Sequence, residues 1–128
     1  MARAVLGREP RPEEGTPEER IREAETGLRV RLPAAMRQYY LAAGEADPVN
    51  RAHNIVFRPE DLRFEEGYLI FMEENQAVVH WGIARADLAH LDPTVWQRVN
   101  GAPPEWYSED VTFSAFIVTS LGTPGRAG

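Results

Sequence analysis

Two apolar runs separated by a short polar break stand out in the pattern of hydrophobic and polar residues. The runs occupy residues 67–72 and 77–83, and the break lies at residues 73–76. Alternating apolar positions on both sides of a polar break predict a β-hairpin. Both faces of this hairpin are largely apolar, so we expect it to lie inside a sheet that is covered on at least one face. The side chains expected to be buried together are Leu69, Phe71, Val79, Trp81 and Ile83.

Helical spacing of apolar residues precedes the hairpin. Thr16 is expected to cap a first helix, Pro17 fits its first position, and the helical pattern continues to about Leu28. A second helix is expected to open at Pro33 and to stop at Gly44, because glycine is a common helix terminator. Two helices therefore come before the first strand signals.

Shorter signals surround the hairpin and follow it. Residues 55–57 and 94–99 read as strands, and residues 59–62 resemble one helical turn. Ser108 is expected to cap a last helix that reaches Leu121, since serine is a favoured N-cap residue and acidic residues follow it. The chain thus reads as helices, then strands, then a closing helix.

Composition predicts one globular domain. The chain has 128 residues, of which 43% are hydrophobic and 27% charged, as is usual for globular proteins. We expect residues 1–15 to form a disordered arm, residues 16–121 a single domain, and residues 122–128 a flexible tail. No apolar run approaches the roughly 18 residues of a membrane span, no secretory signal is evident, and there is no cysteine for a disulfide. A cytoplasmic location without membrane contact is expected.

Charge is unevenly distributed along the chain. Residues 1–59 carry ten arginines and nine acidic residues, whereas residues 60–128 carry four and eleven. An acidic half argues against direct binding to nucleic acid, which needs cationic contacts to phosphates. It suits a basic protein partner, or it forms a solvated face that only keeps the protein soluble. The residues predicted to contact such a partner are Glu60, Asp61, Glu65, Glu66, Glu73 and Glu74.

Residues suited to catalysis or metal binding are not arranged for either. His53, His80 and His90 lack metal-ligand spacing. The adjacent carboxylates at 65–66 and 73–74 are expected to point to opposite faces of a strand or to lie solvated in a turn, where their pKa values stay ordinary. We therefore predict no catalytic residue, no metal and no cofactor. Trp106 is expected in a loop, either as a core residue or as an interface anchor.

A series of short motifs runs through residues 16–121. They are Glu25 followed by Leu28 and Leu32-Pro33, Tyr39-Tyr40-Leu41 before Gly44, Glu74-Asn75-Gln76, Trp81-Gly82-Ile83, Asp92-Pro93-Thr94-Val95, Trp106, and Phe116-Ile117. In order and spacing this series resembles the SUKH superfamily, also called the Smi/Knr-like family. The sequence departs from the family pattern at Arg29, where glycine is common.

The resemblance implies an α/β domain of the α+β kind. Two N-terminal helices would precede a mostly antiparallel central sheet, with a C-terminal helix packed on it. Many bacterial members of the family are immunity proteins that bind and neutralise a toxin delivered between cells, and eukaryotic members resemble regulatory modules linked to cell-wall synthesis. The resemblance therefore implies a non-enzymatic protein-binding domain, with a basic toxin domain as the expected partner. The alternative is a regulatory or scaffold module for a cellular protein, since a fold does not fix its function.

Overall fold

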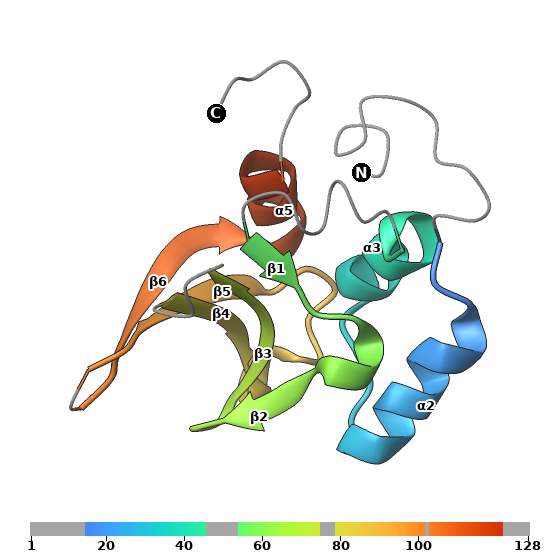
Figure 1. Ribbon diagram of the computed structural model, residues 1–128, viewed down its shortest axis with the longest axis horizontal. Helices are drawn as coiled ribbons and strands as arrows, with labels where there is room; N and C mark the ends of the chain where they lie inside the picture. The colour runs from blue at the N-terminus through green and yellow to red at the C-terminus, as the bar shows by residue number, and fades with distance from the viewer. Residues whose placement is uncertain (1–14, 46–53, 75–78, 102, 122–128) are drawn as a thin grey trace.

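The computed structural model describes residues 15–45, 54–74, 79–101 and 103–121. Its architecture is α+β, and the predicted fold is confirmed: two helices come first, an antiparallel sheet follows, and a helix closes the described chain (Figure 1). Residues 1–14, 46–53, 75–78, 102 and 122–128 lie outside the described residues, and with them most of the predicted arm, the predicted tail and His53. Among the described residues, no helix combines the length and apolar character needed to cross a membrane.

The sheet has six strands in the order β1-β3-β4-β5-β6, and β2 pairs with β3 on the same edge as β1. Every recorded strand pair is antiparallel. The short edge strands β1 and β2 are joined by a 3₁₀ turn, η2, and a second turn, η3, follows β4. The strands and turns are β1 Asn54–Val56, η2 Pro59–Asp61, β2 Arg63–Glu65, β3 Tyr68–Glu74, β4 Val79–Ala84, η3 Arg85–Asp87, β5 Thr94–Val99 and β6 Glu105–Thr112.

The predicted hairpin forms as β3 and β4, but its alternation is interrupted. Ile70 pairs with Gly82 and Met72 pairs with Trp81, so the register shifts between them. This is a β-bulge, in which two residues of one strand face one residue of the other. Strict alternation would have placed Met72 on the face of Ile70, and the bulge moves it to the face of Trp81. The strand also extends to Glu74, so residues 73 and 74 are not part of the turn.

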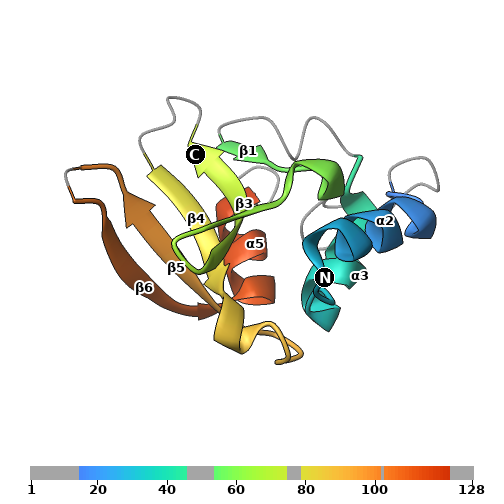
Figure 2. The same ribbon diagram turned by 90° about the horizontal axis from the view of Figure 1, so that it is seen from below.

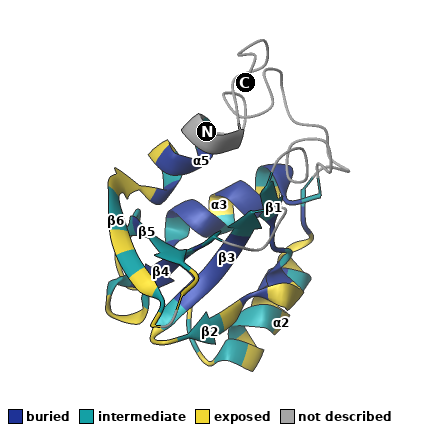
Figure 3. Ribbon diagram, turned by 60° about the vertical axis from the view of Figure 1, so that its left-hand side comes forward, coloured by how far each residue is buried: buried dark blue, intermediate teal, exposed yellow. Residues whose placement is uncertain are grey.

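Three of the five side chains expected to be buried together are fully buried. Leu69, Phe71 and Ile83 are almost inaccessible to solvent, whereas Val79 and Trp81 are only half-buried. The prediction is therefore right for these three residues and wrong for Val79 and Trp81, although Trp81 still contacts Phe116, at 5.9 Å between ring centroids. Figure 3 shows the contrast along the sheet, with β3 mostly buried and β6 largely accessible.

The core lies between the sheet and the helices α3 (Ala34–Ala43) and α5 (Phe113–Leu121). The Phe71 ring packs edge-on against Phe113, with centroids 5.1 Å apart, and against Phe116, at 6.0 Å. Tyr39 of α3 contacts Phe113 at 6.1 Å. The buried Tyr40 hydroxyl donates a hydrogen bond of 2.6 Å to the carbonyl of Phe57. Aromatic packing thus fixes both helices to one face of the sheet.

The first helix, α2 (Glu18–Leu28), begins without the predicted cap. Pro17 occupies the N-cap position and no side chain caps the helix. The Thr16 hydroxyl instead donates to a carboxylate oxygen of Glu45, 3.1 Å away. The two residues are far apart in the sequence, so local spacing gives no sign of this contact. The contact replaces the capping role that was predicted for Thr16.

The segment that joins α2 to α3 explains part of the Glu25-to-Pro33 motif. Arg29 ends α2 in the left-handed region, at φ 60°, a conformation that glycine adopts more readily. The Glu25 carbonyl accepts a hydrogen bond from the Val30 amide at 3.2 Å. The Glu25 carboxylate accepts one from the Leu32 amide at 2.7 Å. Glu25 therefore fixes the turn through both its backbone and its side chain.

The predicted start of the last helix is wrong. Ser108 lies in strand β6, and α5 begins only at Phe113. The Ser108 hydroxyl accepts a hydrogen bond from the Asp110 amide at 3.0 Å, a local pattern that resembles a helix cap. The helix start is held by the loop before β5 instead. Asp92 accepts from the Ser114 amide at 2.9 Å and from its hydroxyl. The capping residue thus comes from a distant segment.

A candidate partner-binding face on the sheet

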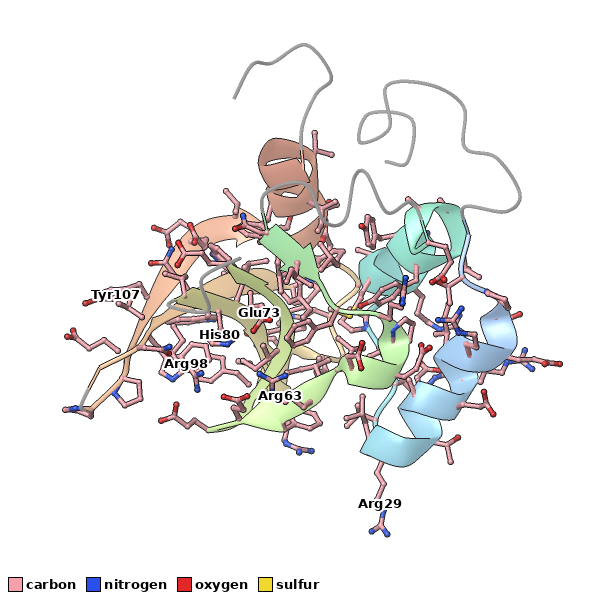
Figure 4. All side chains as sticks on the ribbon, viewed as in Figure 1. Arg29, Arg63, Glu73, His80, Arg98 and Tyr107 are labelled. Carbon is pink, nitrogen blue, oxygen red and sulfur yellow. The ribbon has the colours of Figure 1, made fainter. Side chains whose placement is uncertain are left out.

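Four side chains form a row across the face of the sheet opposite α5. Glu73 of β3 pairs with His80 of β4, His80 pairs with Arg98 of β5, and Arg98 pairs with Trp106 of β6. Directly paired residues in adjacent strands project to the same face. Figure 4 shows the side chains of Glu73, His80 and Arg98 close together beside the strands. Neighbouring strands thus assemble charged and aromatic groups that are far apart in the sequence.

Two further aromatic residues complete this face. Tyr68 of β3 stacks on Trp106 of β6, with ring centroids 3.7 Å apart and planes 12° from parallel. Tyr68 also meets the edge of Trp96 at 5.8 Å. Since β4 and β5 lie between β3 and β6, the stack joins side chains of two strands that are not neighbours in the sheet, whose twist is visible in Figure 2. We refer to Tyr68, Glu73, His80, Trp96, Arg98 and Trp106 as the sheet-face cluster.

Arg98 is the central cation of the sheet-face cluster. Its guanidinium donates to Glu65 at 2.6 Å and to Glu66 at 3.4 Å, and it lies 3.3 Å from Nδ1 of His80. Its side chain is only 13% exposed, so these contacts are poorly screened by solvent. One arginine therefore ties the β2–β3 turn to the middle of the sheet.

The contacts of His80 determine its tautomer. A guanidinium can only donate, so Nδ1 of His80 accepts from Arg98. The proton of neutral His80 is then on Nε2, which lies 3.3 Å from a carboxylate oxygen of Glu73. Burial lowers the pKa of His80, and the positive charge of Arg98 lowers it further, against an opposing effect of Glu73. His80 is therefore neutral at neutral pH, and both of its ring nitrogens are engaged within the protein.

Glu65 is held as a carboxylate. Burial alone raises the pKa of Glu65, but hydrogen bonds from Arg63 and Arg98 outweigh that effect, and the pKa falls below its ordinary value. Arg63 approaches from the same strand, and Arg98 approaches from β5. Two cations thus neutralise much of the field of this carboxylate.

Three nitrogen donors of the sheet-face cluster remain without an acceptor. They are Nε1 of Trp96, Nε1 of Trp106 and Nε of Arg98, each of which is shielded from solvent and has no hydrogen-bond partner among the described residues. A buried donor without an acceptor typically costs 1–3 kcal/mol, and each such group needs an explanation. Because neighbouring groups already shield these three nitrogens from solvent, the nitrogens themselves are not points that a docking partner can contact.

The sheet-face cluster is rich in residue types that are common at protein interfaces. His80 has no free nitrogen for proton transfer to a substrate, and its side chain is only 7% exposed. Among the described residues, no group of three or more histidines and carboxylates is placed to hold a metal ion. Tryptophan, tyrosine and arginine are the residue types that dominate binding energy at protein interfaces. Three of the six members of the cluster are tryptophan or arginine, and a fourth is tyrosine.

The acidic residues predicted to bind a partner are divided between separate places. Three of them lie at the sheet-face cluster: Glu65 and Glu66 contact Arg98, and Glu73 contacts His80. Glu60 and Asp61 lie on η2 beside α2, where Glu60 binds Arg20 at 2.6 Å. The remaining carboxylate, Glu74, ends β3 opposite Asn54 of β1. Trp106, expected in a loop, lies in strand β6 and is half-buried.

Sequence reasoning missed Tyr68, Trp96 and Arg98 as members of a site. The signal available for two of them was their spacing, because Trp96 and Arg98 are two apart in a strand that the sequence did predict, and they share a face. The partner strand β6 was not predicted. Without it, neither residue had a neighbour that would mark it as part of a site.

Comparisons with protein-family models, with curated proteins and with solved structures gave no significant match to this chain.

Proposed function

We propose that this chain is a non-enzymatic protein-binding domain that acts in the cytoplasm as an immunity protein, neutralising a bacterial toxin by stoichiometric binding. The motif order that resembles the SUKH superfamily supports the class of function. The observation that carries the proposal is the group of half-buried aromatic rings on the sheet face, in which Tyr68 stacks on Trp106 and meets the edge of Trp96. These rings lie beside Arg98 and its carboxylates, and aromatic residues and arginine are enriched at protein interfaces.

In the proposed complex, the toxin packs against the half-buried Tyr68–Trp106 stack and the neighbouring Trp96 ring. Basic side chains of the toxin approach the carboxylates at the rim, of which Glu66 is the most accessible, at 47% exposed. Burying the Tyr68–Trp106 stack excludes water and strengthens these polar contacts. Acidic groups around the face raise the rate of encounter with a basic surface. The bound domain then blocks the active site or substrate groove of the toxin.

The test is co-expression with the product of the neighbouring gene, followed by co-purification and a growth assay. We expect a stoichiometric complex and loss of toxicity when this chain is present. Trp106→Phe shrinks the ring that stacks on Tyr68 at the proposed interface, so it should weaken binding about tenfold. Trp81→Phe is the matched control, because Trp81 lies on the other face of the sheet, where it contacts Phe116 of α5 and donates to Glu109 at 2.8 Å.

Three results would argue against the proposal. Equal weakening by Trp106→Phe and Trp81→Phe would remove the sheet-face cluster from the interface. A partner that binds tightly but is not toxic would favour the regulatory or scaffold role. Turnover of a substrate by the isolated protein, lost in His80→Gln, would make this face a catalytic site and overturn the non-enzymatic assignment.

A further inference from the structure

A second surface, away from the sheet-face cluster, has the opposite electrostatic character. It is an open groove of about 710 Å³ between the start of α3, with the segment before it, and the turn η3 with the loop after it. Figure 2 shows that loop, which follows β4, close to α3. A hydrogen bond of 2.9 Å from the Ala35 amide to the Leu91 carbonyl joins the two walls. We refer to this groove as the α3–η3 groove.

The α3–η3 groove has a buried apolar base and two exposed leucines above it. Leu32 and Leu88 are buried at its base, whereas Leu41 is 43% exposed and Leu91 is 77% exposed. Leu91 has the most exposed side chain among the large hydrophobic residues described. A single exposed leucine is ordinary, but two that line one groove over a buried apolar base form a place where another apolar side chain can be buried.

All the ionisable residues that line the α3–η3 groove are basic: Arg31, Arg37, Arg85 and His90. Arg37 is bound to Glu18 and Glu25, at 3.3 Å each. Within the described part of the chain, neither Arg31 nor Arg85 has a carboxylate within 4.0 Å. Arg85 lies over the ring of Phe64, 3.8 Å from its centroid. The groove therefore offers unneutralised positive charge in a protein whose net charge is −6.

We propose that the α3–η3 groove binds an acidic amphipathic segment of a partner protein. A leucine-like side chain of that segment would enter between Leu41 and Leu91, and its carboxylates would pair with Arg31 and Arg85. Charge complementarity is the basis of this choice of occupant, because a basic segment would meet only like charge in the groove. The proposal goes beyond the sheet-face cluster, since the two surfaces share no residue.

A protein segment fits this groove better than nucleic acid does. Single-stranded nucleic acid is bound by aromatic side chains on which bases stack. The lining of the α3–η3 groove has aliphatic side chains and no phenylalanine, tyrosine or tryptophan. Arginines that flank aliphatic pockets instead match a helix whose leucines face the groove and whose glutamates face the rim.

The experiment measures fluorescence anisotropy of a labelled synthetic peptide that carries leucines at helical spacing among glutamates. We expect saturable binding to the full chain that weakens with added salt. Arg31→Glu should weaken binding about fivefold, and Leu91→Asp about tenfold. Arg29→Glu is the matched control, since Arg29 projects away from the molecule at the end of α2 and the change in net charge is the same (Figure 4). Circular dichroism verifies that each variant is folded.

Several outcomes would overturn the proposal. Failure of the native chain to bind the peptide at millimolar concentration would exclude the proposed site. Equal binding of a peptide with serines in place of its leucines would exclude the apolar part of the contact. Equal weakening by Arg29→Glu and Arg31→Glu would reduce the effect to overall charge. Tighter binding of oligouridine than of the acidic peptide would assign the groove to nucleic acid. None of these measurements involves a toxin, so they are independent of the proposed immunity function.

Discussion

Replacing Arg98 with methionine tests whether the charged contacts of the sheet-face cluster stabilise the fold. Methionine retains an unbranched side chain that can still pack beside Trp106, so the change removes mainly the guanidinium. Glu65 would lose its bond of 2.6 Å and His80 its donor on Nδ1. Glu65 keeps Arg63 and is 26% exposed, which limits the penalty. Hydrogen bonds to charged groups contribute 1.5–3 kcal/mol, so we expect a loss of about 2 kcal/mol.

Urea denaturation at neutral pH measures this loss directly, provided that the slope of free energy against urea is unchanged. Arg29→Met is the control, because Arg29 is exposed and should change the stability by at most about 0.5 kcal/mol. The Arg98→Met variant has a second readout. Removing the positive charge of Arg98 should raise the pKa of His80, which an NMR titration measures. A loss below about 0.5 kcal/mol together with an unchanged pKa of His80 would refute the reasoning.

Three further predictions follow from single contacts. Phe71→Ala should cost about 3–5 kcal/mol in urea denaturation, because its fully buried ring packs on two phenylalanines of α5. Trp81→Phe should cost only about 1 kcal/mol, since it is half-buried and loses chiefly its bond to Glu109, which Gln97 still satisfies. Because the pKa of His80 is lowered from 6.5 in the folded state, stability should fall as the pH drops through about 6.5, and His80→Gln should flatten that part of the profile.

Elements whose signals are local could be predicted from the sequence. Both N-terminal helices, the hairpin and the strand at 94–99 each carry their periodicity within one segment, and all are present. The helix ends and strand irregularities that depend on contacts with distant segments were not predicted correctly. Thr16 bonds to Glu45 across the fold, and no local pattern indicates that preference over a capping role. The bulge at Phe71 likewise depends on the partner strand.

The region around Ser108 shows why one strand was missed. Serine followed by two acidic residues is typical of a helix start, and a hydrogen bond of that kind does form, between the Ser108 hydroxyl and the Asp110 amide. It is made inside a strand, where Asp110 has a φ of 59° and the register with β5 shifts. Pairing with β5 outweighs the local preference for helix. The helix begins only where Asp92 reaches Ser114.

The distribution of charge along the chain is a poor guide to the charge that a partner would meet. Residues 60–74 include six acidic residues and one arginine. Without partners from other segments, these acidic residues would form a strongly negative surface. Folding brings Arg20 to Glu60, Arg98 to Glu65 and Glu66, and His80 to Glu73.

Arginines of the N-terminal half give part of the surface a positive charge. That half is nearly neutral as a sum, yet its Arg31 joins Arg85 from the acidic half to make the α3–η3 groove positive. Net charge per segment is conserved on folding, but its placement is set by the strand order and the turns. The acidic segment therefore supplies buried or half-buried ion pairs at the sheet-face cluster, and the exposed positive charge gathers where no carboxylate lines the surface. Two surfaces of opposite character on one small domain follow from this placement, and each favours a partner of different chemistry.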